Sequence, residues 1–160
     1  VYVAVMMSFI YQIRELQNGG EFVVLLFLAA WGNDTLAYCT GMLIGKHKMS
    51  PILSPKKSIE GLVGGIVGAA ILGALYGLYL NTYIRFSFNP VTMFPIVCGL
   101  SGAVSVIGDL AASAIKRDSG IKDYGTLIPG HGGILDRFDS IIFIAPVIYY
   151  LTVMISGGAI

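Results

Sequence analysis

Residues 59–80 read IEGLVGGIVGAAILGALYGLYL, an unbroken apolar run in which Glu60 is the only charged residue. A helix of about 20 such residues is long enough to cross the hydrocarbon core of a bilayer. The run also contains several Gly-x-x-x-Gly spacings, formed by Gly61, Gly64, Gly65, Gly68, Gly73 and Gly77. Such spacings are typical of transmembrane helices that pack closely. We therefore predict that this helix packs through its glycines, either within a bundle or across a homodimer.

The rest of the chain has the same apolar character. It has 160 residues, of which 56% are hydrophobic and 12% charged, and its mean hydropathy is +0.80. Five apolar stretches can be distinguished: Val1–Ile13, Phe22–Ile44, Ile59–Leu80, Val91–Ile115 and Ile134–Ile155. The last four reach the length of a membrane-spanning helix. The first is too short and lacks an initiator Met and a basic segment, so we interpret it as the tail of a truncated span.

These features predict an all-α, polytopic transmembrane bundle of about five spans. The prediction is one membrane-embedded domain, residues 1–160, that is a fragment of a longer protein with further helices before it. Its topology follows from the basic residues, because cytoplasmic loops retain Lys and Arg. Eight of the ten lie in or beside two connections: Lys46, Lys48, Lys56 and Lys57 in one, and Lys116, Arg117, Lys122 and Arg137 in the other. We expect an integral protein of the cell (inner) membrane with both connections facing the cytoplasm.

Aspartates interrupt the predicted spans. Asp34 lies about 18 Å from the basic end of its helix, near the bilayer centre, where insertion of Asp costs about 2.5–3.5 kcal/mol. Helical spacing places Tyr38, Gly41 and Gly45 on the same face as Asp34. A carboxylate retained at such a depth normally faces a protein interior or an aqueous cavity, so we expect this face to point inward.

Two further spans carry carboxylates toward the same basic side. Ser105, Asp109, Ser113 and Arg117 form a polar stripe at four-residue spacing, while Asp136 and Asp139 stand at the start of the last span. In one interpretation each Asp pairs with a nearby base, such as Asp109 with Lys116, and only fixes packing. Convergence of the four aspartates would instead require a compensating cation. Hard oxygen ligands suit Mg²⁺, so we predict a metal-phosphate site.

The first basic connection, residues 45–61, offers groups that bind phosphate. Ser58 is positioned to cap the helix that follows, whose N-terminal amides favour an anion, and Lys56 and Lys57 add positive charge. A plain basic loop that contacts anionic lipid is an equally good interpretation. The segment lacks the spacing and the hydroxyl residue of a Walker loop.

The second basic connection is the most specific segment of the chain. From Ser113 it reads Ser-x-x-Lys-Arg, then Lys122-Asp123, then Pro129-Gly-His131-Gly-Gly and Asp136-Arg-x-Asp139. This pattern resembles the signature of the phosphatidate cytidylyltransferases, also called CDP-diacylglycerol synthases. Two earlier blocks, from Asp34 to Lys46 and from Ser54 to Gly61, are also similar to that family. The family commonly has Thr-Trp where this chain has Ser58-Ile59, so the hydroxyl is retained and the aromatic ring is lost.

The resemblance implies nucleotidyl transfer from CTP to phosphatidate, which yields CDP-diacylglycerol and pyrophosphate. It implies catalytic roles for Asp109, Asp136, Asp139, His131, Lys116 and Arg117. It implies substrate contacts by Lys56, Lys57, Ser58, Glu60, Ser113, Lys122, Asp123 and Arg137. It also implies that Mg²⁺, and a second cation if one binds, is held by Asp109, Asp136, Asp139 and Asp34. We expect these groups around a polar cavity lined by the second, fourth and fifth spans. Residues 1–160 would then be a catalytic domain whose active site faces the cytoplasm.

Two alternatives remain open. An ion-coupled transporter would also retain intramembrane aspartates and glycine-rich helices. A related cytidylyltransferase would act on another lipid phosphate, such as an archaeal ether lipid. The expected partners are CTP, phosphatidate and membrane lipids, and no nucleic acid is expected.

Overall fold

A computed structural model describes residues 2–50, 54–121 and 135–156, without the side chains of Tyr2, Ser50, residues 54–56, Leu135 and Arg137. The helices are α1 (Tyr2–Glu15), α2 (Gly19–Phe27), the π-helical segment η1 (Leu28–Gly32), α3 (Asn33–Ile44), α4 (Ile59–Leu80), α5 (Pro90–Asp118) and α6 (Leu135–Ile155). Because η1 joins α2 to α3 without a break, residues 19–44 form one long helix.

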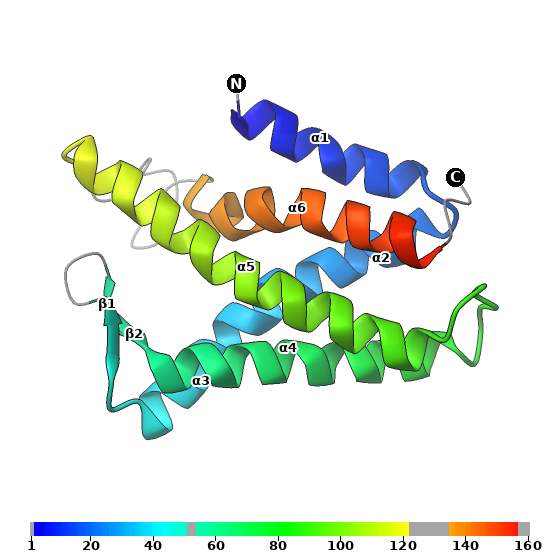
Figure 1. The fold of residues 1–160 in the computed structure, drawn as a ribbon, viewed down its shortest axis with the longest axis horizontal. Coiled ribbons are helices and arrows are strands. Elements are labelled where there is room, and N and C mark those ends of the chain that lie inside the picture. The colour runs from blue at the N-terminus through cyan, green and yellow to red at the C-terminus, as the bar shows by residue number, and fades with distance from the viewer. Residues whose placement is uncertain (1, 51–53, 122–134, 157–160) are drawn as a thin grey trace.

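The helices form a single bundle (Figure 1). α5 packs against both α4 and α6, while α3 covers the first half of α4 and α1 lies on α6. By length and composition, four helices can cross a membrane: Gly19–Ile44, Ile59–Leu80, Pro90–Asp118 and Phe138–Ile155. The predicted all-α polytopic bundle is therefore confirmed. The first apolar stretch forms the shorter α1, which is not among the four.

Capping residues set where α4 and α5 begin. The Ser58 hydroxyl accepts a hydrogen bond from the Gly61 amide at 3.1 Å, as its position in the sequence predicted. Asn89 accepts from the Val91 amide at 3.0 Å, and Pro90 occupies the first turn of α5, where its missing N–H is not needed. The observed starts of these two helices therefore lie within one residue of the predicted ones.

Two opposite faces of α4 explain its place in the bundle. Gly61, Gly64, Gly65 and Gly68 lie against α3, whereas Gly73 and Gly77 lie against the start of α5. The other face carries Val63, Val67, Ile71 and Leu75, each more than half exposed and four residues apart. A row of exposed aliphatic side chains is stable in lipid and costly in water. All six glycines are thus used in packing within the chain.

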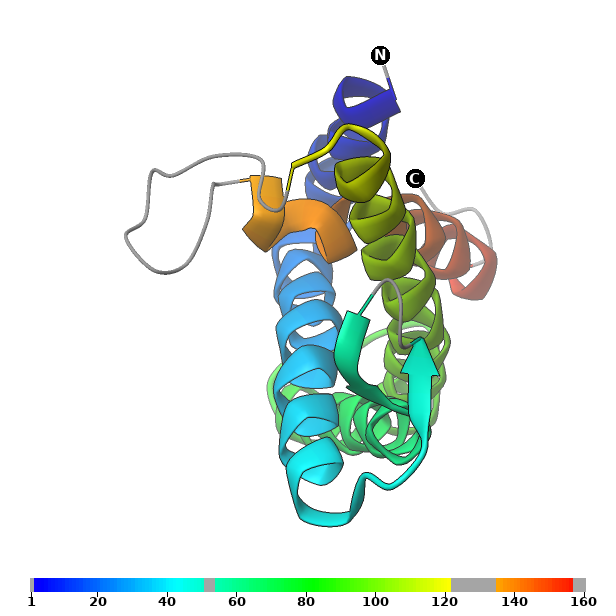
Figure 2. The same cartoon turned by 90° about the vertical axis from the view of Figure 1, so that its left-hand side faces the viewer.

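A short β-hairpin was not predicted. Strands β1 (Lys48–Ser50) and β2 (Ser54–Ser58) pair antiparallel, with Lys48 opposite Ser58. The hairpin lies at the end of the bundle where α5 ends and α6 begins, and that end faces the viewer in Figure 2. It thereby brings the first basic connection over the ends of the helices that carry the aspartates.

Candidate active site

Three carboxylates from three different helices meet at one hydroxyl group. The Ser140 Oγ lies 2.5 Å from an oxygen of Asp109, 3.4 Å from Asp34 and 3.5 Å from Asp139. Ser140 is 2% exposed, and its backbone amide also donates to the Asp139 carboxylate at 2.8 Å. The tertiary structure therefore brings together the carboxylates of α3, α5 and α6 that the sequence placed on separate spans.

Two lysines neutralise part of this negative charge. The Lys57 ammonium group, on β2, donates to the Asp109 carboxylate. Lys116, near the end of α5, pairs with Asp136 at 2.8 Å and lies 3.9 Å from Asp139. Asp136 thus joins the cluster through Lys116. We call the group Asp34, Asp109, Asp136, Asp139, Ser140, Lys57 and Lys116 the carboxylate cluster. The pairing of Asp109 with Lys116, which the packing interpretation suggested, is wrong, because Lys57 occupies that position.

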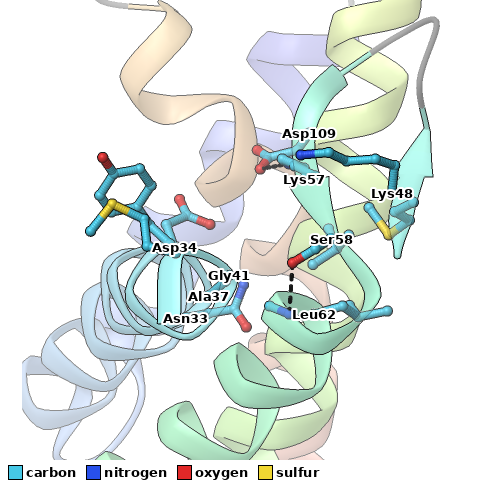
Figure 3. Close-up of a pocket in the computed structure, with 14 residues that line it drawn as sticks. Asn33, Asp34, Ala37, Gly41, Lys48, Lys57, Ser58, Leu62 and Asp109 are labelled. Carbon is cyan, nitrogen blue, oxygen red and sulfur yellow. Dashed lines mark hydrogen bonds and ion pairs between the residues drawn. The ribbon is translucent and has the colours of Figure 1, made fainter. Parts of the chain in front are cut away.

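A cavity of about 550 Å³ opens beside the cluster (Figure 3). Its walls come from α3, the hairpin, the start of α4 and α5, and they include Asn33, Asp34, Ala37, Tyr38, Gly41, Met42, Lys48, Met49, Lys57, Ser58, Gly61, Leu62, Val106 and Asp109. The predicted inward direction is confirmed for Asp34 and Gly41. Tyr38 stands at the cavity wall but is 62% exposed, and Gly45 is not among the lining residues. A volume of this size accommodates a substrate or cofactor.

The prediction that the second, fourth and fifth spans line the cavity is partly wrong. The fifth span, α6, contributes none of the described lining residues, and its Ser140 instead donates a hydrogen bond to Asp109, which does line the cavity. The third span takes its place. The glycines of α4 draw its first turns against α3, which brings Gly61 and Leu62 into the wall.

Glu60 holds the connection between α3 and the hairpin. Its carboxylate accepts hydrogen bonds from the backbone amides of Lys46 and His47 at 3.1–3.3 Å. It also lies 2.6 Å from the His47 Nδ1. Glu60 was predicted to contact substrate, but it does not line the cavity, and its carboxylate orders the chain that leads into β1.

The remaining predicted residues fall into two groups. Ser113 is half-buried one turn beyond Asp109, and Arg117 is exposed at the end of α5. Neither lines the cavity, and Arg117 makes no ion pair with a described residue. His131, Lys122 and Asp123 lie outside the described residues, as do the side chains of Lys56 and Arg137. The roles assigned to these residues stay predictions.

Three residues of this region were not singled out from the sequence. Ser140 follows Asp139 directly, and a serine at the start of an apolar helix carries no distinctive pattern. Lys48 lines the cavity because β1 turns it inward, which a loop prediction did not anticipate. Asn33 was not considered, because the charge of the neighbouring Asp34 was the stronger signal. A polar residue beside an intramembrane carboxylate was the one signal available for it.

Comparison with known proteins shows which family this chain belongs to. The model of the cytidylyltransferase family matches residues 1–155. The chain belongs to the cytidylyltransferase family. It is 37% identical over 154 residues to a phosphatidate cytidylyltransferase of Staphylococcus saprophyticus, and 40% identical over 152 residues to one of Staphylococcus aureus. These alignments cover 96% and 95% of this chain.

Membership of this family bears on the alternatives left open by the sequence. The chain spans 56% of the length of these two relatives, which is about half of each. Membership of the family supports the interpretation as a cytidylyltransferase and gives no support to the interpretation as an ion-coupled transporter. The intramembrane aspartates, which suggested a transporter, instead belong to a cluster with two lysines beside a cavity.

Proposed function

We propose that this chain forms the catalytic part of an enzyme that transfers the cytidylyl group of CTP to phosphatidate. A phosphatidate oxygen attacks the α-phosphorus of CTP, a new phosphorus–oxygen bond forms, and the bond to the departing pyrophosphate breaks. The products are CDP-diacylglycerol and pyrophosphate. The attacking phosphate is already an anion near neutral pH, so the reaction depends on alignment and charge neutralisation more than on a general base.

The observation that carries this proposal is the carboxylate cluster beside the cavity. Its lysines reach the carboxylates from two different elements, Lys57 from the hairpin and Lys116 from α5. Ammonium groups in such positions stabilise the negative charge of a triphosphate and of the pentavalent transition state. Lys48 adds a third positive charge at the cavity wall. Phosphate groups of both substrates are therefore expected between the hairpin and the carboxylates.

The donor set fits a Mg²⁺ ion by its chemistry. The carboxylates of Asp34, Asp109 and Asp139 share the Ser140 hydroxyl, and all four residues offer oxygen ligands only. Among the described residues no three acidic, His or Cys side chains form a ready-made metal cage. Mg²⁺ does not require one, because it usually takes one or two carboxylates together with substrate phosphates. When bound, the ion would neutralise phosphate charge and orient the reacting groups.

The cavity suits one water-soluble and one lipid substrate. Tyr38 and Met42 in its wall are 62% and 66% exposed, on a face of α3 that would lie in lipid. The opposite wall is formed by the lysine-bearing hairpin. We propose that phosphatidate enters sideways past α3 and that CTP enters from the cytoplasm past the hairpin. Membrane lipids and both substrates are the expected partners. A homodimer gains no support from the glycines of α4, since these pack against α3 and α5.

The proposal is tested with the complete protein, radiolabelled CTP and phosphatidate in mixed micelles, with and without Mg²⁺. We expect Mg²⁺-dependent release of pyrophosphate and formation of a labelled liponucleotide. Asp109→Asn should lower the rate by at least about 100-fold, since it removes charge from the centre of the cluster.

Asp118→Asn is the matched control, because Asp118 is an exposed carboxylate at the end of the same helix. It should retain the activity of the wild type. Near-normal turnover by Asp109→Asn, with folding verified by thermal unfolding, would contradict the proposed site.

A further inference from the structure

Asn33 is a buried polar residue that has no role in the proposed reaction as described above. It is 1% exposed, it lines the cavity, and it directly follows the π-helical segment η1. Neither its amide nitrogen nor its amide oxygen has a hydrogen-bond partner among the described residues. The carboxamide lies close enough to Asp34 to influence that carboxylate, but it makes no hydrogen bond with it by geometry. Leaving a buried amide unpaired is costly, so a ligand is expected to satisfy it.

Glycines on two neighbouring helices make room for this side chain. A Cβ atom at Gly65 of α4 would lie 2.8 Å from the Asn33 Oδ1, and one at Gly102 of α5 would lie 3.0 Å from it. Any larger residue at either position would displace the carboxamide. Asn33 is therefore held at the crossing of α3, α4 and α5, where it forms an inner end of the cavity.

The Asn33 carboxamide neighbours Asp34 of the carboxylate cluster, but on α5 it lies against a residue that is farther from the basic connections than Asp109 is. Gly102 precedes Asp109 on α5 by about two helical turns, or ~10 Å, in the direction away from the basic connections. Figure 3 shows Asn33 on the side of α3 that faces α4, away from Asp109 and Lys57. The cavity wall also includes the apolar residues Ala37, Leu62 and Val106.

The order of these groups matches the order of groups in a diacyl lipid phosphate. Its phosphate is outermost, its two acyl esters lie next, and its hydrocarbon chains extend into the bilayer. A phosphate at the lysines would place the ester carbonyls on the membrane side of the cluster, within the apolar part of the cavity. The water-soluble nucleotide is not expected to extend toward the membrane side of the cluster.

We propose that the Asn33 carboxamide donates a hydrogen bond to an acyl ester carbonyl of the lipid substrate, so that the enzyme selects ester-linked over ether-linked lipid phosphates. This inference rests on the proposed function, and it adds the residue that would distinguish ester from ether linkages. A dialkyl ether analogue has the same phosphate and the same chains but no carbonyl oxygen. It would leave the buried Asn33 amide unpaired, which lowers kcat/KM by about tenfold.

The test compares dioleoyl phosphatidate with its dioleyl ether analogue in the complete protein. We expect the wild type to prefer the ester about tenfold in kcat/KM, and Asn33→Leu, which is near in volume and has no donor, to lose that preference. Asn33→Ser keeps a shorter donor and should retain part of it. Ser101→Ala is the matched control. It removes a fully buried hydroxyl that, like the Asn33 carboxamide, lacks a partner among the described residues. Ser101 does not line the cavity, so the preference for the ester should be unchanged.

Equal rates for ester and ether in the wild type would overturn the inference while leaving the proposed function intact. So would an Asn33→Leu variant that is slower with both lipids by the same factor, since this would assign Asn33 a role through Asp34 alone. If Asn33→Leu does not fold, an unchanged preference in Asn33→Ser would have the same meaning. A wild type that forms no liponucleotide from either lipid would instead overturn the proposed function, and this inference with it.

Discussion

Ser140 is the residue on which the geometry of the carboxylate cluster depends. A single hydroxyl has one proton to donate, yet Ser140 Oγ lies within 3.5 Å of oxygens from three carboxylates. The carboxylates repel one another, and Lys57 and Lys116 offset only part of that repulsion. The hydroxyl therefore stabilises an arrangement that would otherwise open.

Ser140→Ala should destabilise the protein by about 1–3 kcal/mol, because a carboxylate that lies in the protein interior loses its donor. It should also raise the Mg²⁺ concentration needed for half-maximal activity, since the carboxylates are then less well ordered. Thermal unfolding in detergent and a Mg²⁺ titration of the activity measure the two effects.

Ser156→Ala serves as the control for this change. Ser156 lies just after α6, at the end of that helix far from the cluster, and its hydroxyl donates to the Val153 carbonyl. The substitution should change stability by less than about 0.5 kcal/mol. If Ser140→Ala were as stable and as active as Ser156→Ala, the hydroxyl would have no part in the cluster.

At the scale of elements, α4 organises the bundle because its small residues permit close contact with two helices. A Cβ atom at Gly73 would lie 2.7 Å from the Phe94 carbonyl oxygen, which belongs to the backbone of α5 and cannot rotate away. By contrast, a Cβ atom at Gly99 of α5 would meet only the Ala70 side chain, at an ordinary 3.6 Å. The two glycines thus differ in how much space surrounds them, although both lie within helices.

Gly73→Ala should therefore destabilise the protein by about 1–3 kcal/mol, as is usual for overpacking, and loosen the contact of α4 with α5. Gly99→Ala should be neutral or stabilising by up to about 1 kcal/mol, because alanine favours the helix. The midpoints of thermal unfolding in the same detergent compare the two. A Gly73→Ala variant as stable as Gly99→Ala would show that the helices separate more easily than the structure indicates.

At the scale of the whole molecule, the two ends of the bundle are chemically different. One end carries the hairpin, the carboxylate cluster and most of the basic side chains that the structure describes. The other end carries aromatic side chains such as Phe22, Phe86 and Phe88. Positive charge near the ends of spans favours the cytoplasmic side. The orientation of the protein in the cell membrane can be tested on exposed residues of the two ends.

We expect Ser119→Cys to react with a membrane-impermeant maleimide only after the cells are permeabilised, and Thr82→Cys to react in intact cells. Ser119 follows α5 at the end near the hairpin, and Thr82 follows α4 at the other end, and both are exposed. The exposed Cys39 is first replaced by Ser, whereas Cys98 is buried. Reaction of Ser119→Cys in intact cells would reverse the proposed topology.

The sequence by itself determined the four long spans, their boundaries to within a few residues and the polar positions within them. These features depend on local properties: apolar length, capping residues and helical periodicity. Periodicity also predicted correctly that Asp34 and Gly41 face inward, whereas Tyr38 of the same predicted face is largely exposed. It fixes the direction of a side chain relative to its own helix, but not the rotation or height of one helix against another.

Only the tertiary structure decided which groups meet. The pairing of Lys57 with Asp109, the position of Ser140 among three carboxylates and the burial of Asn33 between Gly65 and Gly102 join segments far apart in the chain. Each depends on how closely the glycines allow the helices to approach and on the hairpin that turns the first basic connection inward. Because packing between helices determines these contacts, they cannot be predicted from the pattern of residues within one helix.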